Sequence, residues 1–231
     1  MHSIRRPWVT SEIAAALVSS QRAALRSGAE TLRARRVAKR IQVALFDGFE
    51  ATDALAPFDV WKLANRLGAD LQAELVTVTP ADEVVALDGV CIRPTASFDA
   101  RADVLVVPGA PEVWRAGAMP TGLREVLHGF QAQGQVLATV GTGAVFAAWA
   151  GRLQGRAAIS HRAALPVLEQ QGAKVTHARV VDDGDLVSCG GGTSGVDLAL
   201  HLVERFFGSE LALSVEESME YERHGTVWRS G

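Results

Sequence analysis

One acidic residue and three glycine-containing turns have the residue types and spacing from which a catalytic pocket can be built. Asp53 follows an apolar run that ends at Phe46, and the turns at 108–111, 141–143 and 189–195 follow other apolar runs. Glycine lets backbone N–H groups approach a ligand closely. A carboxyl group in an apolar cleft has a raised pKa and can both give and accept a proton. The pattern therefore predicts acid/base chemistry beside backbone donors.

Each of these features also has an ordinary structural explanation. A glycine turn by itself is most simply a tight connection between a strand and a helix. Asp53 has a position typical of a residue that caps the start of a helix. The convergence of three such turns beside one acid favours a pocket, in which four backbone N–H groups are predicted to stabilise an anion: those of Gly109, Ala110, Thr142 and Gly143.

The elements that must position these residues alternate between apolar strands and amphipathic helices. This alternation predicts an α/β fold, with a doubly wound, mostly parallel sheet of about six or more strands and helices on both faces. The expected core strands are 41–46, 73–79, 104–107 and 136–140, with hairpins at 84–98 and 180–187. The expected helices are 53–67, 121–133, 144–150, 162–171 and 196–207. Ligands bind beyond the carboxyl ends of such strands, where Asp53 and the three turns fall.

Composition and charge divide the 231 residues into an extension, 1–40, and a domain, 41–231. The extension contains nine Lys or Arg and two Glu, a net charge of +7, whereas the domain has a net charge of −10. We expect the basic extension, helical over 12–39, to dock on its own domain or on a partner subunit. The alternative is an arm that binds anions or nucleic acid. The apolar stretch 13–18 is shorter than the ~7–15 residues of an export signal.

Several function classes are disfavoured by what the sequence lacks. No apolar run approaches the ~18 residues of a membrane span. Two cysteines, Cys91 and Cys189, cannot form a disulfide framework, which indicates a cytoplasmic location. No group of His, Cys and Asp residues has metal-ligand spacing, and the 190–192 glycines lack a phosphate-binding fingerprint. We therefore expect neither a metal nor a cofactor.

Five stretches, in order along the chain, resemble motifs of the ThiJ/PfpI superfamily, which has a class I glutamine amidotransferase-like fold. Within this superfamily, the stretches are most similar to those of the isocyanide (isonitrile) hydratase-like proteins. In the first stretch, Asp53 stands four positions before Pro57, as an acidic residue does in that family. The stretches are 46–57, 106–110, 135–153, 153–161 and 179–208, and the match covers about 41–225. The resemblance implies a flavodoxin-like sheet, a small-molecule substrate and a homodimer.

The chain departs from the family at the centre of the implied site. The family's turn reads Val-Cys-Thr-Gly and contains the nucleophilic cysteine, whereas this chain has Val140, Gly141, Thr142 and Gly143. Glycine adopts the strained backbone of such a turn at little cost, so the replacement relaxes the turn and removes the thiolate together. Covalent thiol chemistry at this position is excluded.

Other residues are weighed for a place in the pocket. The resemblance puts His161 at a histidine position of the family, where it either contacts substrate or has only a structural role. Cys189, at the head of the glycine loop, is either a substitute nucleophile or an inert buried filler. Cys91 is expected to pack in its hairpin, and Glu50 to be a solvated loop acid. Three tryptophans are expected to pack in the core, although the first two could line a cleft: Trp61, Trp114 and Trp149.

These observations favour a cofactor-independent enzyme, a lyase, hydratase or cyclase, that acts on a small molecule through proton transfer by Asp53. A second hypothesis is a non-catalytic domain that binds a small molecule, and a third is a scaffold that acts through its dimer. A ligand sensor within a transcription regulator is disfavoured, because no helix-turn-helix pattern follows the domain. Nucleic acid and membranes are accordingly not expected partners.

Overall fold

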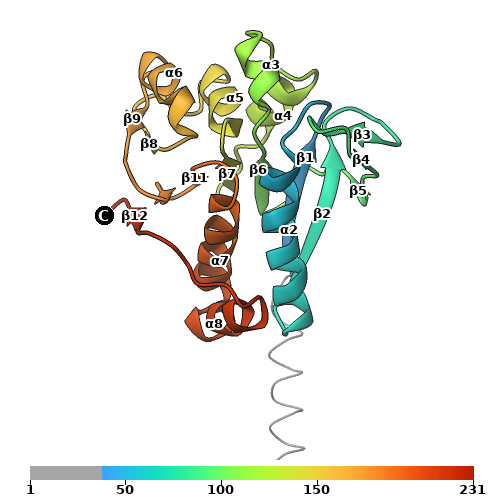
Figure 1. The fold of residues 1–231 in the computed structure, drawn as a ribbon, viewed down its shortest axis with the longest axis vertical. Helices are drawn as coiled ribbons and strands as arrows, with labels where there is room; N and C mark the ends of the chain where they lie inside the picture. Colours follow the sequence, from blue (N-terminus) through green and yellow to red (C-terminus); the bar gives the residue numbers. More distant parts are fainter. Residues whose placement is uncertain (1–37) are drawn as a thin grey trace, which may run out of the picture. The chain divides into compact units, whose positions relative to one another are not determined.

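The computed structural model describes residues 38–231, so most of the expectations for the basic extension lie outside the described residues. At its end, Lys39 and Arg40 already belong to the first strand, so the expected helix does not extend to residue 39. The main sheet has eight strands in the order β12-β10-β11-β7-β6-β1-β2-β5 (Figure 1). All neighbouring strands in it are parallel except β10 and β11. In chain order these strands are β1 (Lys39–Leu45), β2 (Leu71–Thr77), β5 (Ala96–Ser97), β6 (Val104–Val107), β7 (Val136–Val140), β10 (Val180–Asp182), β11 (Leu186–Cys189) and β12 (Val227–Arg229).

The central strands confirm the predicted flavodoxin-like fold. Their spatial order, β2-β1-β6-β7-β11, is the second, first, third, fourth and fifth of these strands along the chain. From β1 the chain moves to β2 on one side, and from β6 it moves to β7 on the other. Because crossovers between parallel strands are right-handed, the connecting helices cover opposite faces. The direction reverses between β1 and β6, and such a switch point is where flavodoxin-like sheets bind their ligands.

The helices in the described residues are α2 (Ala51–Arg66), α3 (Pro111–Arg115), α4 (Leu123–Gly129), α5 (Gly143–Trp149), the 3-10 turn η1 (Arg162–Ala164), α6 (Leu165–Gln170), α7 (Ser194–Phe207) and α8 (Ser209–Ser218). Helices α2 and α7 lie side by side across one face of the sheet, with α8 at their far end (Figure 1). Gly195 permits this contact, because a Cβ atom there would lie 3.2 Å from the ring of Pro57.

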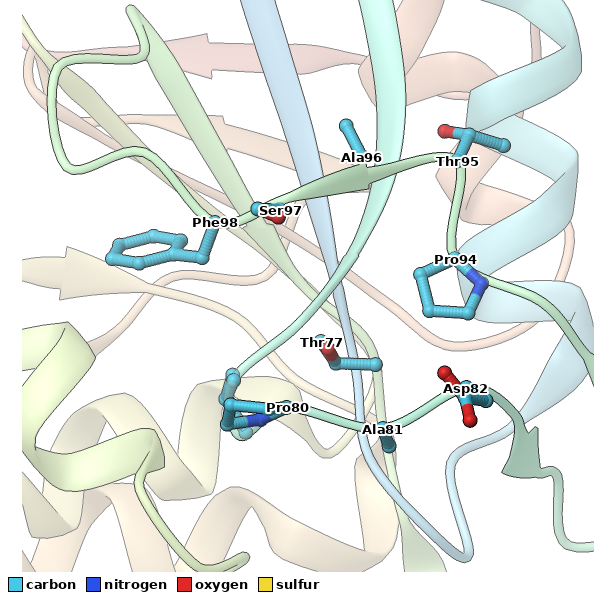
Figure 2. A pocket seen from close by; sticks show the side chains of 10 residues that line it. Thr77, Pro80, Ala81, Asp82, Pro94, Thr95, Ala96, Ser97 and Phe98 are labelled. Atoms are coloured by element: carbon cyan, nitrogen blue, oxygen red, sulfur yellow. The ribbon is translucent and has the colours of Figure 1, made fainter.

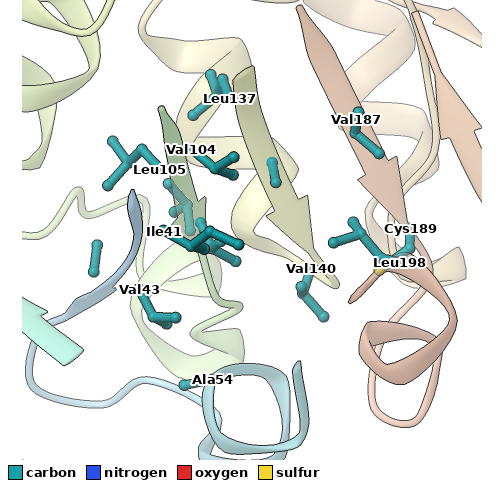
Figure 3. Close-up of a cluster of buried hydrophobic side chains, with 14 of the residues drawn as sticks. Ile41, Val43, Ala54, Val104, Leu105, Leu137, Val140, Val187, Cys189 and Leu198 are labelled. Atoms are coloured by element: carbon teal, nitrogen blue, oxygen red, sulfur yellow. The ribbon is translucent and has the colours of Figure 1, made fainter. Parts of the chain in front are cut away.

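The core lies between the sheet and its helices. Strands β6 and β7 are buried along their whole length, as expected for parallel strands covered on both faces. Apolar side chains from β1, β6, β7 and β11 meet there, joined by Leu198 from α7 (Figure 3). This packing holds the carboxyl ends of four strands at one edge of the sheet and so determines where the turns that follow them meet.

Several elements differ from the sequence-based expectations. The expected 84–98 hairpin closes earlier, as the antiparallel pair β3 (Val84–Val85) and β4 (Cys91–Ile92), and Ala96–Ser97 joins the main sheet beside β2 instead. Cys91 is exposed, so the expectation that it packs was wrong. The expected 121–133 helix forms only over Leu123–Gly129. Residues 157–158 pair with β9 (Lys174–Val175) as a separate two-stranded sheet, in which they form β8 (Ala157–Ala158).

Within residues 38–231, no helix is long and apolar enough to cross a membrane. In the same residues, no cluster of three or more His, Cys, Asp or Glu side chains is arranged to hold a metal ion.

Candidate functional site

Asp53 lies in the first turn of α2, directly beyond the carboxyl end of β1. Its side chain does not bond to its own helix. Oδ2 accepts a hydrogen bond from the N–H of Gly109 at 3.1 Å, and Oδ1 accepts one from the N–H of Gly192 at 2.7 Å. Because both donors come from turns distant in the sequence, Asp53 is not a helix cap here. The carboxyl group instead joins the turns after β6 and β11.

The environment of Asp53 raises the pKa of its carboxyl group. Its exposed fraction is 2%, and burial raises its pKa from 3.8 to about 6, although the hydrogen bonds from Gly192 and Gly109 oppose the rise. The nearby Glu50 carboxylate raises the pKa further by repulsion. No cation bonds to the Asp53 carboxyl group within the described residues. An acid with a pKa near neutrality can both donate and accept a proton at physiological pH.

Gly141 makes room for this carboxyl group. Its φ is +57°, in the left-handed region that favours glycine. A Cβ atom at this position would overlap Oδ2 of Asp53. The turn itself is fastened on both sides, because the Gly141 N–H donates to the carbonyl of Gly190 at 3.1 Å and its own carbonyl accepts from Ser160 Oγ at 2.8 Å. The Asp53 carboxyl group thus occupies the space into which a side chain at position 141 would project.

The predicted backbone donors are partly engaged within the protein. The N–H of Gly109 donates to Asp53, and the N–H of Ala110 donates to Thr142 Oγ1 at 2.9 Å. Gly143 starts α5 so close to β6 that a Cβ atom would overlap the carbonyl oxygen of Val107. The first two donors therefore hold the site together.

A cavity of about 360 Å³ opens over Asp53. Four of the eight predicted site residues line it: Asp53, Gly141, Thr142 and His161. The other four, Gly109, Ala110, Gly143 and Cys189, are buried behind this lining. The cavity walls thus come from the turns after β1, β7 and β11 and from the segment that precedes η1.

His161 and Cys189 have different positions relative to the cavity. His161 is exposed, and its Nδ1 accepts a hydrogen bond from the N–H of Ala163 at 3.3 Å, which leaves Nε2 as the nitrogen that carries the proton in the neutral ring. Cys189 is fully buried, and burial together with the nearby Asp53 carboxylate raises the pKa of its thiol. A thiol held in its protonated form is a poor nucleophile, so this environment disfavours Cys189 as a substitute nucleophile.

Part of the cavity wall was not anticipated from the sequence. Helix α3 contributes three side chains: Glu112, Trp114 and Arg115. A proline at the start with an acid beside it is a helix-start signal, but five residues are too few for a periodic pattern. Glu50, which we expected to be a solvated loop acid, is half-buried and lines the cavity. Of the tryptophans, Trp114 lines the cavity, Trp61 is fully buried, and Trp149 packs edge-on against Phe146.

A larger cavity of about 700 Å³ lies at the β5 edge of the sheet. It is lined by the end of β2, the loop that contains Pro80 and Asp82, and the segment from Pro94 to Phe98 (Figure 2). Asp82 is its only charged lining residue, and its prolines and small side chains offer no second acid or base. The chemistry therefore concentrates in the smaller cavity over Asp53.

The flavodoxin-like sheet, with a candidate site at its switch point, defines a broad class of α/β proteins. Residues 39–205 match the model of the DJ-1/PfpI family. The chain belongs to this family, which confirms the resemblance seen in its motifs.

The curated relatives include an enzyme and transcriptional regulators. The chain is 34% identical to an isonitrile hydratase from Pseudomonas putida over 193 residues, which cover 80% of this chain and 79% of that protein. It is 29% identical to the HTH-type transcriptional regulator CdhR from Pseudomonas aeruginosa over 177 residues, 75% of this chain and 52% of the regulator. The chain thus spans about half the length of that regulator and most of the hydratase.

Solved structures agree with the fold. Drosophila melanogaster DJ-1beta superposes with a TM-score of 0.72 at 22% identity, over 81% of this chain and 100% of that chain. An AraC family transcriptional regulator from Pseudomonas putida superposes with a TM-score of 0.67 at 27% identity, over 78% of this chain and 99% of the other.

Proposed function

We propose that this protein is a cofactor-independent enzyme of the hydratase type, in which Asp53 transfers the proton to and from a small organic substrate. The observation that carries the proposal is a buried carboxyl group with a pKa of about 6 that faces a cavity at the switch point. Glycine at position 141 leaves no thiol in the turn, and the only thiol nearby, that of Cys189, is buried behind the cavity.

Hydration of an organic isonitrile illustrates how one carboxyl group serves the reaction. Asp53, protonated, gives its proton to the terminal carbon of R–N≡C, and water adds to the same carbon. The proton released by that water returns to the Asp53 carboxylate, and the adduct tautomerises to the formamide R–NH–CHO. With a pKa of about 6, about a tenth of the enzyme carries the required proton at pH 7. General acid/base catalysis of this kind contributes ~10²–10⁴-fold.

The charges around the cavity favour a neutral substrate over an anion. Three carboxyl groups line it, those of Glu50, Asp53 and Glu112. The one arginine among the lining residues, Arg115, is paired with Glu112 at 2.9 Å. Among residues 38–231, a carboxylate or phosphate in this cavity would meet like charges and no unpaired cation in the lining, whereas a small uncharged molecule would not be repelled.

Turnover of an aliphatic isonitrile, with the formamide followed by NMR, tests the proposal. We expect Asp53→Asn to lower turnover by ~10²-fold or more, since an amide cannot transfer the proton. The matched control is Asp59→Asn, which changes an exposed acid on the same helix and should leave turnover unchanged. Near-full activity of Asp53→Asn on a substrate that the wild type turns over would refute the mechanism.

A non-catalytic ligand-binding domain is the second candidate function. It is supported by the regulators among the relatives and by the engagement of Gly109 and Ala110 N–H groups within the protein. Binding without turnover of the bound compound, equally strong in wild type and Asp53→Asn, would favour it.

The homodimer also remains a proposal, and light scattering at micromolar concentration that gives a monomer of 24.5 kDa would refute it.

A further inference from the structure

The glycine loop of residues 190–193 supplies one of the two hydrogen bonds to Asp53, yet the loop has little intrinsic rigidity. The shorter of the two hydrogen bonds to Asp53 comes from Gly192, at 2.7 Å. Gly192 has a φ of +62°, and two further glycines precede it. Glycine loses more conformational freedom on ordering than any other residue. Other groups must therefore hold the loop against Asp53.

Arg179, directly before β10, contacts this loop at both ends. Its carbonyl oxygen accepts a hydrogen bond from the N–H of Gly190 at 3.3 Å, and its Nη2 donates to Thr193 Oγ1 at 3.1 Å. Gly192 lies between these two anchor points. Arg179 thus holds both ends of the segment that donates to Asp53, one end through its backbone carbonyl and the other through its guanidinium.

Asp197 in turn holds Arg179. Its buried carboxyl group, in the first turn of α7, accepts from Arg179 Nε at 2.5 Å. It also accepts from the Tyr221 hydroxyl at 3.0 Å and from the N–H of His224 at 3.0 Å. The segment that follows α8 therefore closes over Arg179, and a Cβ atom at Gly225 would lie 3.0 Å from the Arg179 side chain. A continuous set of hydrogen bonds leads from this segment to the loop beside Asp53.

We propose that Arg179 and Asp197 are positioning residues that hold the 190–193 loop, and with it the Gly192 N–H group, against Asp53, and that the segment 221–224 supports them. The inference rests on the proposed role of Asp53 in proton transfer. The alternative is that the Arg179–Asp197 ion pair only stabilises the fold. In that case, removing the pair would leave the environment of Asp53 unchanged.

The titration of Asp53 itself tests the inference without a substrate. The signal is the ¹³C resonance of the carboxyl carbon, assigned by its loss in Asp53→Asn. Losing the Gly192 hydrogen bond removes an interaction that favours the charged carboxylate. We therefore expect Arg179→Gln to raise the titration midpoint by roughly half a pH unit or more and to speed hydrogen exchange of the Gly192 N–H group. The substitution leaves the other titratable groups around Asp53 in place: Glu50, Glu112, Arg115, His161 and Cys189.

Matched variants separate positioning from stability. Arg156→Gln removes another partly buried arginine that is paired with Asp183 and Asp185, so it should lower stability without moving the Asp53 midpoint. Thr193→Val removes only the side-chain contact of Arg179 with the loop and should raise the midpoint in the same direction, whereas Thr193→Ser, which keeps the hydroxyl, should retain the wild-type value. Should Arg179→Gln not fold, the two Thr193 variants decide the matter.

Two results would overturn the inference. One is a wild-type Asp53 midpoint in Thr193→Val and in any folded Arg179→Gln. The other is an equal shift in Arg156→Gln. A raised midpoint in Arg179→Gln with unchanged turnover of a substrate across the pH range would support the positioning role and refute Asp53 as the proton-transfer residue.

Discussion

Two buried aspartates show that hydrogen-bond and charge partners, rather than burial alone, decide the pKa of an acid. Asp53, with an exposed fraction of 2%, accepts hydrogen bonds only from backbone N–H groups, and its pKa rises to about 6. Asp182, with an exposed fraction of 7%, ends β10, which runs antiparallel to β11. It contacts His201 Nε2 at 2.7 Å and Arg205 Nη1 at 3.1 Å.

The pKa of Asp182 is lowered. Burial raises it, but the hydrogen bond with His201 and the charge of Arg205 outweigh that effect. An acid with a cationic partner stays ionised over a wide pH range, whereas a buried acid with only amide donors takes up a proton at a higher pH. The comparison teaches that burial without a cationic partner makes the Asp53 carboxylate electrostatically unfavourable, whereas the partners of Asp182 offset the same burial.

The largest expected effect is the loss of stability when Asp182 is replaced. Asp182→Ala leaves His201 buried and Arg205 without its acidic partner, so we expect it to lower the free energy of unfolding by about 3 kcal/mol. Asp53→Asn should change stability by only about 1 kcal/mol at pH 7, because loss of an accepted hydrogen bond offsets relief of the buried charge. Urea denaturation of both variants checks the ordering, and the reverse ordering would break the comparison.

The pH dependence of stability should have opposite signs at the two aspartates. Because the pKa of Asp53 is raised from 3.8 to about 6 on folding, its contribution is present below pH 3.8 and is lost as the pH rises through 6. We expect wild type to lose about 2 kcal/mol relative to Asp53→Asn between pH 4 and pH 7. The contribution of Asp182, whose pKa is lowered, is instead lost as the pH falls. Parallel unfolding curves of wild type and Asp53→Asn across this pH range would contradict the raised pKa.

A side chain at position 141 should disturb the Asp53 region specifically. Gly141→Ala places a Cβ atom on a left-handed backbone and against the Asp53 carboxyl group, so we expect a loss of about 1–2 kcal/mol. In an Asp53→Ala background the overlap is absent, so the same substitution should cost less, and thermal melts of the double-mutant cycle measure the difference. Strict additivity would show that the carboxyl group does not occupy this space.

The smallest expected effect concerns the thiols. Cys91→Ser alters an exposed side chain and Cys189→Ser a buried one behind the cavity. Both should leave turnover within a factor of about two, because the proposed proton transfer requires no thiolate. Loss of turnover in a folded Cys189→Ser variant would instead make Cys189 the nucleophile and Asp53 its helper.

Much of the site was predictable because its parts are local. Asp53 and the 141–143 turn follow apolar strands and were found from those patterns, and the alternation of strands and helices predicted the sheet that joins them. Helix α3, which supplies Trp114 and two charged side chains to the cavity, was missed because its five residues are too short for a periodic signal. The second hydrogen bond to Asp53, from Gly192, joins residues 139 positions apart, and no local pattern reveals such a contact.

The sequence by itself determined the fold class, the family and the place of Asp53 after the first strand, since these depend on apolar periodicity and short motifs that any stretch of chain carries locally. Only the tertiary structure decided the state of that acid. The pKa of Asp53 depends on how completely the surrounding turns exclude water and on which groups from β6 and β11 face it. Both are set by the packing of distant segments against one another, because desolvation and hydrogen bonding act through space rather than along the chain.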